Sequence, residues 1–241
     1  SKYIRMIREA LKKAVFANVP IISLNFKGLE SDNKFSITLG MVRRAVAAIM
    51  YGDLLMILKN QIEPYEVIKG QTTKYIDKWI TYLGAEIKSG KNLSVFCIKK
   101  MFRSISNDFK NVGQQEKNIK KVGIVGELYV KYCHLGNWNL EKFLRDESCE
   151  YMVNGFSWYI LYYIDTHLTE EKVILGSLYK IALKFLKNLQ KAMIDSIFSA
   201  GFHCIDEFSV FKHNAEGKVS YKYTVADGWL IGCEIVNLVL M

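Results

Sequence analysis

The sequence predicts an α/β fold that is rich in helix and holds a small parallel, Rossmann-like sheet. Helical hydrophobic periodicity recurs along most of the chain. Only 2 of the 241 residues are proline, which is costly inside helices. Beyond residue 120, short β-runs alternate with helical segments, which is typical of parallel strands covered by helices. We expect one domain, with a helical insertion over residues 27–120 and β/α units over residues 121–241.

The first half of the chain is expected to hold one strand among several helices. Apolar residues of Tyr3–Ala14 recur at helical spacing, whereas the short apolar run Val19–Phe26 indicates a buried strand. The segment Thr38–Asn60 is apolar almost all round, which is typical of a buried helix. Two further helices are predicted at Thr72–Leu83 and Leu93–Phe109.

The second half opens with two β/α pairs. Strand Val122–Val125 precedes a helix at Asn139–Asp146, and strand Cys149–Val153 precedes a helix at Trp158–His167. Because each strand is followed by a helix, the two strands are expected to run parallel.

The longest predicted element is the helix Thr169–Ala200, with Thr169 as its N-cap and Gly201 as its C-cap. One of its faces is apolar and another is basic. A nucleic-acid groove would require arginines and interleaved aromatic residues, which the basic face lacks. It is therefore interpreted as a solvated face or, alternatively, as a docking surface. This lysine stripe comprises Lys180, Lys184, Lys187 and Lys191.

The last part of the chain is predicted less completely. Residues 202–225 fit either a hairpin around Asn214–Gly217 or a loop. The segment Asp227–Met241 is predicted to be a helix that stays apolar to its last residue. Such an end predicts that the chain is a piece cut from a larger protein.

The composition narrows the classes of protein that the chain can belong to. Hydrophobic residues make up 50% of it, so it can build a sizeable core rather than stay disordered. No apolar run approaches the roughly 18 residues that cross a bilayer. The net charge of +9 fits nucleic acid, an anionic ligand or a solvated surface. The five cysteines form no C-x-x-C pair, and scattered free cysteines are typical of a reducing cytoplasm.

No catalytic or nucleotide-binding motif is complete. The stretch Lys121–Tyr132, KVGIVGELYVKY, lacks the third glycine of a dinucleotide turn and the Gly-Lys-Ser/Thr of a phosphate loop. Glu127 would also repel a phosphate, although its place after a strand puts it on the functional rim of an open sheet. The histidines have no metal-ligand spacing and are interpreted as surface or core residues. They are His134, His167, His203 and His213.

Four blocks in order carry a family resemblance. They are YGDLLM, PYE, GIVGE and GWLIGCEI, at residues 51–56, 64–66, 123–127 and 228–235. Together they resemble the 2-hydroxyglutaryl-CoA dehydratase D-component-like region of long CoA-substrate-specific enzyme activases, over nearly the whole chain. Two positions depart from the family pattern: Glu63 stands where an arginine is usual, and Cys233 where a small residue is usual.

The resemblance implies a part in ATP-driven, iron–sulfur electron transfer in anaerobic bacteria. In that family an ATPase module passes electrons to a cluster-bearing, dehydratase-like module that acts on CoA thioesters. None of the five cysteines here matches a cluster motif, so no cofactor is expected in this fragment and an iron–sulfur cluster is implied for the whole protein. By itself the fragment is expected to be inactive.

The expected role is to help wall the cluster or substrate cavity. The resemblance implies that its rim comprises Gly123, Gly126, Glu127, Tyr129, Trp229 and Glu234. Gly126 would permit close backbone approach, and Glu127 would cap the next helix or bind a neighbouring loop. The alternative is a non-catalytic docking module between the ATPase and cluster-bearing modules, with the lysine stripe as the contact. Nucleic acid and membrane are not expected as partners.

Overall fold

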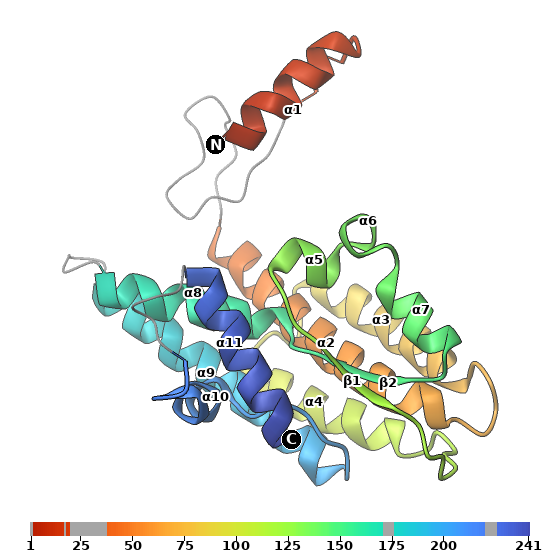
Figure 1. Ribbon diagram of the computed structural model, residues 1–241. Coiled ribbons are helices and arrows are strands. Elements are labelled where there is room, and N and C mark those ends of the chain that lie inside the picture. Colours follow the sequence, from red (N-terminus) through yellow and green to blue (C-terminus); the bar gives the residue numbers. More distant parts are fainter. Residues whose placement is uncertain (1, 17, 20–37, 171–175, 220–225) are drawn as a thin grey trace. The chain divides into compact units, whose positions relative to one another are not determined.

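The computed structural model describes residues 2–16, 18–19, 38–170, 176–219 and 226–241 (Figure 1). They fall into two units, Ser1–Val42 and Arg43–Met241, which are described separately. The first unit contains helix α1 (Lys2–Lys13), as predicted; Lys12 and Lys13 lie in its last turn, where cations favour the helix dipole. The predicted strand Val19–Phe26 lies outside the described residues apart from Val19, which is not in a strand.

The helices predicted for the first half are present, with longer C-terminal ends for two of them. Gly90, with a φ of 71°, ends α3, and its backbone N–H donates to the carbonyls of Glu86 and Ile87. The Ser94 side chain caps α4 by accepting from the Cys97 N–H. The elements are α2 (Leu39–Ile62), the short 3₁₀ helix η1 (Glu63–Tyr65), α3 (Gln71–Ser89) and α4 (Val95–Phe109).

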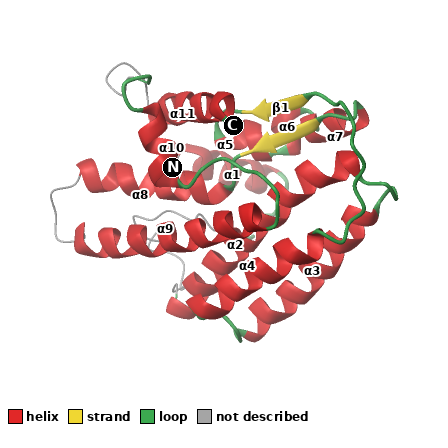
Figure 2. Ribbon diagram, turned by 90° about the horizontal axis from the view of Figure 1, so that it is seen from below, coloured by secondary structure: helices red, strands yellow, loops and turns green. Residues whose placement is uncertain are grey.

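The predicted parallel strand pair is confirmed. Strands β1 (Lys121–Ile124) and β2 (Glu150–Val153) pair in parallel, with Lys121 opposite Glu150 and Ile124 opposite Val153. In the described part of the chain this sheet has two strands, drawn in yellow in Figure 2. The crossover between the strands carries three short helices: α5 (Leu128–Tyr132), α6 (His134–Asn137) and α7 (Leu140–Asp146).

The two faces of the sheet pack against different elements, because successive side chains of a strand point to opposite sides. Tyr151 and Val153 belong to a small apolar cluster with Leu144 of the crossover. On the other face Met152 joins the main core, and Gly123 lies against Leu238 near the C-terminus. Every residue of β2 is buried, so β2 is covered on both faces.

The prediction of one helix from Thr169 to Ala200 is wrong at its start. Thr169 lies in α8 (Phe156–Glu170), and α9 (Gly176–Ser199) is a separate helix that packs against α8. A helical periodicity that continues along the sequence cannot reveal that two helices are present. The C-cap is confirmed: Gly201 has a φ of 85°, its N–H donates to Phe198, and the next N–H donates to Ile197, as in a Schellman motif.

The hairpin-or-loop prediction for residues 202–225 is wrong over Phe208–Ala215, which forms helix α10. Phe208, Phe211 and Ala215 recur at helical spacing and are buried, and Gln190 accepts a hydrogen bond from the Phe208 N–H at 2.8 Å. The polar residues between these apolar anchors hide the helical pattern in the sequence. Residues 220–225 lie outside the description, and the last helix is α11 (Ala226–Leu240), close to its predicted range.

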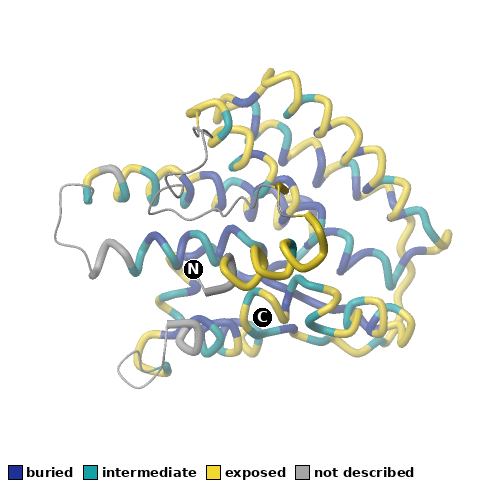
Figure 3. The backbone as a smooth tube through the Cα atoms, turned by 90° about the horizontal axis from the view of Figure 1, so that it is seen from above, coloured by how far each residue is buried: buried dark blue, intermediate teal, exposed yellow. Residues whose placement is uncertain are grey.

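One hydrophobic core of the second unit draws on helices from both predicted parts of the chain. Its buried members run from Ala47 and Leu54 on α2 to Leu189 on α9 and Phe211 on α10. Figure 3 shows buried stretches on these helices in dark blue. The division into residues 27–120 and 121–241 stays a prediction. Within the described ranges, none of the helices combines the length and apolar character that a membrane span requires.

Candidate functional site

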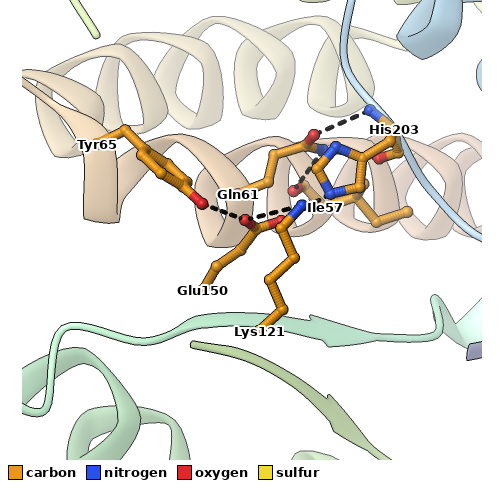
Figure 4. A network of polar contacts seen from close by, with 6 residues as sticks. All are labelled: Ile57, Gln61, Tyr65, Lys121, Glu150 and His203. Atoms are coloured by element: carbon orange, nitrogen blue, oxygen red, sulfur yellow. Dashed lines mark hydrogen bonds and ion pairs between the residues drawn. The ribbon is translucent and has the colours of Figure 1, made fainter. Parts of the chain in front are cut away.

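A buried carboxylate stands where the sheet begins. Lys121 and Glu150 are the first residues of their strands and face each other in register. The Glu150 side chain is 5% exposed and has three partners. The Tyr65 hydroxyl donates to its Oε2 at 2.6 Å, His203 Nε2 lies 2.6 Å from its Oε1, and Lys121 Nζ lies 3.6 Å from its Oε2 (Figure 4). We call these four residues, together with Gln61, the Glu150 network.

Gln61 fixes His203 through the backbone. Its side-chain amide donates to the His203 carbonyl at 3.0 Å and accepts from the His203 N–H at 3.0 Å, while also donating to the Ile57 carbonyl of its own helix (Figure 4). Gln61 is 4% exposed, so this bidentate contact is shielded from water. The loop after α9 is thereby held against α2, and the imidazole is aimed at Glu150.

The Glu150 network stabilises the ionised form of Glu150. Burial acts to raise the pKa of this carboxyl, but the hydrogen bonds from His203 and Tyr65 and the charges of His203 and Lys121 outweigh it and lower the pKa. Burial and the bond to Glu150 raise the pKa of Tyr65 to about 12. The network therefore consists of an anionic carboxylate and a neutral phenol at neutral pH.

His203 is the one member of this network with evident proton-transfer chemistry. Its side chain is 37% exposed. When Nε2 carries the proton donated to Glu150, Nδ1 keeps a lone pair that can accept a proton. The sequence interpretation of His203 as an ordinary surface or core residue missed this contact. Its partners, Gln61 of α2 and Glu150 of β2, come from two separate segments, and no local spacing connects them to His203.

A second buried polar group lies beyond the carboxyl ends of the strands. Lys131 of α5 and Glu234 of α11 form an ion pair in which the two side chains are 2% and 1% exposed. Asn154, directly after β2, is also buried. Asn154 Oδ1 and Nδ2 and Glu234 Oε2 have no hydrogen-bond partner among the described residues. We call Lys131, Asn154 and Glu234 the Lys131 cluster.

In the Lys131 cluster, burial and the neighbouring groups act on the pKa of Glu234 in opposite directions. Burial raises the pKa of Glu234, whereas the Lys131 charge and the Gly126 backbone N–H act in the opposite direction. The Asn154 side chain also acts to lower this pKa. Buried polar atoms without partners are a feature of sites that hold water or a ligand.

A third carboxylate, Asp53 of α2, lies next to the same strand end. It accepts hydrogen bonds from the N–H groups of Phe156 at 2.7 Å and Ser157 at 2.8 Å, at the start of α8. A Cβ on Gly155 would collide with its carboxylate, so glycine is required for this approach. Burial raises the pKa of Asp53 to about 6, although the bonds from Ser157 and Phe156 oppose the shift.

The structure brings together only some of the predicted rim residues. Gly123 of β1 lies against Leu238 of α11, Glu234 of the same helix pairs with Lys131 of α5, and Gly126 follows β1 with a φ of 147° that favours glycine. Glu127 caps α5: its side chain accepts a hydrogen bond from the Tyr129 N–H at 3.2 Å, which agrees with the predicted capping role. Glu127 and Tyr129 are exposed and take no part in the Lys131 cluster.

Trp229 belongs to α11, but its side chain lies outside the described part of the structure. Sequence reasoning also missed Lys131 and Asn154. In the sequence, a lysine in LYVKY and an asparagine after a β-run are typical of exposed surface positions. Only the burial of Lys131 and Asn154 in the structure distinguishes them from ordinary surface residues.

Two of the four lysines of the stripe make contacts with other described residues, and two make no ion pair with them. Lys180 and Lys184 are exposed and make no ion pair with the described residues. Lys187 lies 5.4 Å from the centre of the Phe208 ring, and Lys191 pairs with Glu207 at 3.1 Å and with Asp195 at 3.7 Å.

The residues described do not fit an iron–sulfur cluster. Among them, no three His, Cys, Asp or Glu side chains gather closely enough to hold a metal ion. A cluster requires several convergent thiolates. Burial raises the pKa of Cys233 to about 12 and that of Cys204 further, which favours the neutral thiol. No cluster is assigned to this chain.

Comparison with family models, with curated proteins and with solved structures found no match. The two polar groups at the ends of the sheet therefore define the candidate site by geometry alone.

Proposed function

We propose that this chain is a cavity-wall domain of an ATP-dependent, iron–sulfur protein that resembles 2-hydroxyacyl-CoA dehydratases and their activases, and that it is inactive in isolation. In this proposal the sheet and its crossover form a small Rossmann-like unit, with residues 27–120 as a helical insertion. The cluster is ligated by other parts of the protein, and the location is cytoplasmic. The partners are the ATPase module and the cluster-bearing module.

One observation carries the proposal: three of the four blocks that carry the resemblance meet where the parallel strands end. YGDLLM supplies Asp53, GIVGE supplies the turn at Gly126, and GWLIGCEI supplies Glu234. Burial raises the pKa of Tyr132 most, and the charges of both Asp53 and Glu234 raise it further. Ligands of open parallel sheets bind at this end of the strands.

Iron and acid-labile sulfide content after anaerobic purification tests the proposal. We expect this chain to hold neither, and a chain extended at both ends by several tens of residues to hold both. In the extended protein, Glu234→Gln should reduce turnover of a 2-hydroxyacyl-CoA thioester, whereas Lys184→Glu should leave it unchanged. An extended protein without iron or sulfide would contradict the proposal, as would equal turnover by both variants.

A docking role for the lysine stripe is the second candidate, because Lys180 and Lys184 are exposed without described ionic partners. Docking predicts that the double variant Lys180→Glu/Lys184→Glu uncouples ATP hydrolysis from electron transfer while iron content stays normal. Unchanged coupling would exclude these two lysines as the contact. Lys187 and Lys191 are poorer test positions, since their replacement also breaks contacts within the chain.

A further inference from the structure

A polar groove lies between α4 and α9, away from both polar groups of the sheet. Its volume is about 270 Å³. Apart from Ala192, the residues that line it are polar or charged. They are Lys99, Arg103 and Asn107 of α4, and Asp195, Ser196 and Ser199 of α9.

The α4 side of the groove presents two cations and an amide in a row. Lys99, Arg103 and Asn107 are four residues apart, so they lie on one face of the helix. Within the described residues, neither Lys99 nor Arg103 forms an ion pair or a side-chain hydrogen bond. Lys99 is half-buried. Two cations without carboxylate partners at a concave surface make a site for an anion.

The α9 side presents an acceptor and a hydroxyl. Asp195 is exposed and is partly neutralised by Lys191 at 3.7 Å. Ser196 forms a packed floor: it is buried, donates to the Met193 carbonyl at 2.7 Å and lies 3.0 Å from the Ser106 hydroxyl. Ser199 carries an exposed hydroxyl, and Lys110 Nζ donates to its carbonyl at 3.4 Å, which offsets the negative end of α9.

We propose that this groove binds a small phosphorylated molecule that also carries hydroxyl groups, such as a sugar phosphate. Lys99 and Arg103 bind the phosphate, with Asn107 and Ser199 as neutral donors. Asp195 accepts hydrogen bonds from ligand hydroxyls and disfavours a second anionic group. The volume is slightly below the usual range for small-molecule pockets, roughly 300–1,000 Å³, which suits a ligand of this size. The proposal does not depend on the function proposed above.

Titration calorimetry of the intact chain with ribose 5-phosphate, inorganic phosphate and ribose tests the proposal. We expect ribose 5-phosphate to bind most tightly and ribose not to bind. Arg103→Gln should weaken ribose 5-phosphate binding about tenfold or more, because a charge-assisted contact is lost. Lys100→Gln is the matched control: it makes the same change of charge on the same helix, outside the groove, and should have little effect.

Asp195→Asn separates the two halves of the site. We expect it to weaken ribose 5-phosphate relative to inorganic phosphate, because the hydroxyl acceptor is weakened while the repulsion of the anion is relieved. Absence of ribose 5-phosphate binding at millimolar concentration would overturn the proposal. Equal losses in Arg103→Gln and Lys100→Gln would also overturn it, since they would indicate attraction by net charge alone.

Discussion

The Lys131–Glu234 ion pair allows a sharp stability prediction. Both side chains are almost fully buried, so Lys131→Met removes the positive charge and leaves a buried carboxylate without its partner. Breaking such a pair costs about 3–5 kcal/mol of unfolding free energy. For a domain of this size, roughly 2–4 °C of melting temperature corresponds to each kcal/mol, so we expect a decrease of about 6–20 °C.

Urea unfolding followed by circular dichroism at pH 7 measures this loss. Lys142→Met is the control, because the Lys142–Asp146 pair is exposed and should contribute less than about 1 kcal/mol. The double variant Lys131→Met/Glu234→Met should recover most of the loss, since no unpaired charge remains. The deficit of Lys131→Met should also shrink as the pH falls, because a protonated Glu234 needs no cation.

Two results would refute this reasoning. A loss below about 1 kcal/mol in Lys131→Met would mean that water reaches Glu234. A double variant as unstable as the single variant would mean that Lys131 acts through the packing of its stem and not through its charge.

Three further predictions concern the ends of the sheet. Because the pKa of Asp53 is raised from 3.8 to about 6, its contribution to stability should fall as the pH rises between these two values, and Asp53→Asn should remove this contribution in pH-resolved urea unfolding. Gly155→Ala should cost about 1–3 kcal/mol in the same assay, because its methyl group meets the Asp53 carboxylate; an unchanged midpoint would contradict this. Tyr65→Phe should lose roughly 1–3 kcal/mol at pH 7, and the loss should shrink once the pH falls through the lowered pKa of Glu150; a pH-independent loss would argue against the bond.

The positions of most helices follow from the sequence because their cause is local. A segment that is apolar almost all round predicts α2, apolar residues three and four apart predict α3 and α4, and glycine beyond a helical run predicts the end of α9 at Gly201. The parallel pairing of β1 and β2 follows from their alternation with helices. The cap at Glu127 is equally local, since it joins residues two apart.

The candidate site could be predicted only in part. Gly123 and Glu234 are predicted through the resemblance; in the structure Gly123 lies against Leu238 of α11, and Glu234 of α11 pairs with Lys131 of α5. The partners that give Glu234 its chemistry, Lys131 and Asn154, have no sequence signal. In the Glu150 network, His203 and Glu150 are 53 residues apart, and neither belongs to a motif.

The sequence by itself therefore determined where most of the helices lie, because helical periodicity and caps depend on side chains within a turn or two of one another. It also predicted the parallel strands, through the alternation of β-runs with helical segments. The tertiary structure alone decided where α8 and α9 divide and that residues 208–215 form a helix, because both depend on distant packing partners. It also decided which charges are buried. Lys131 and Glu234 are 103 residues apart, and only the approach of α5 and α11 removes both from water and makes them a pair.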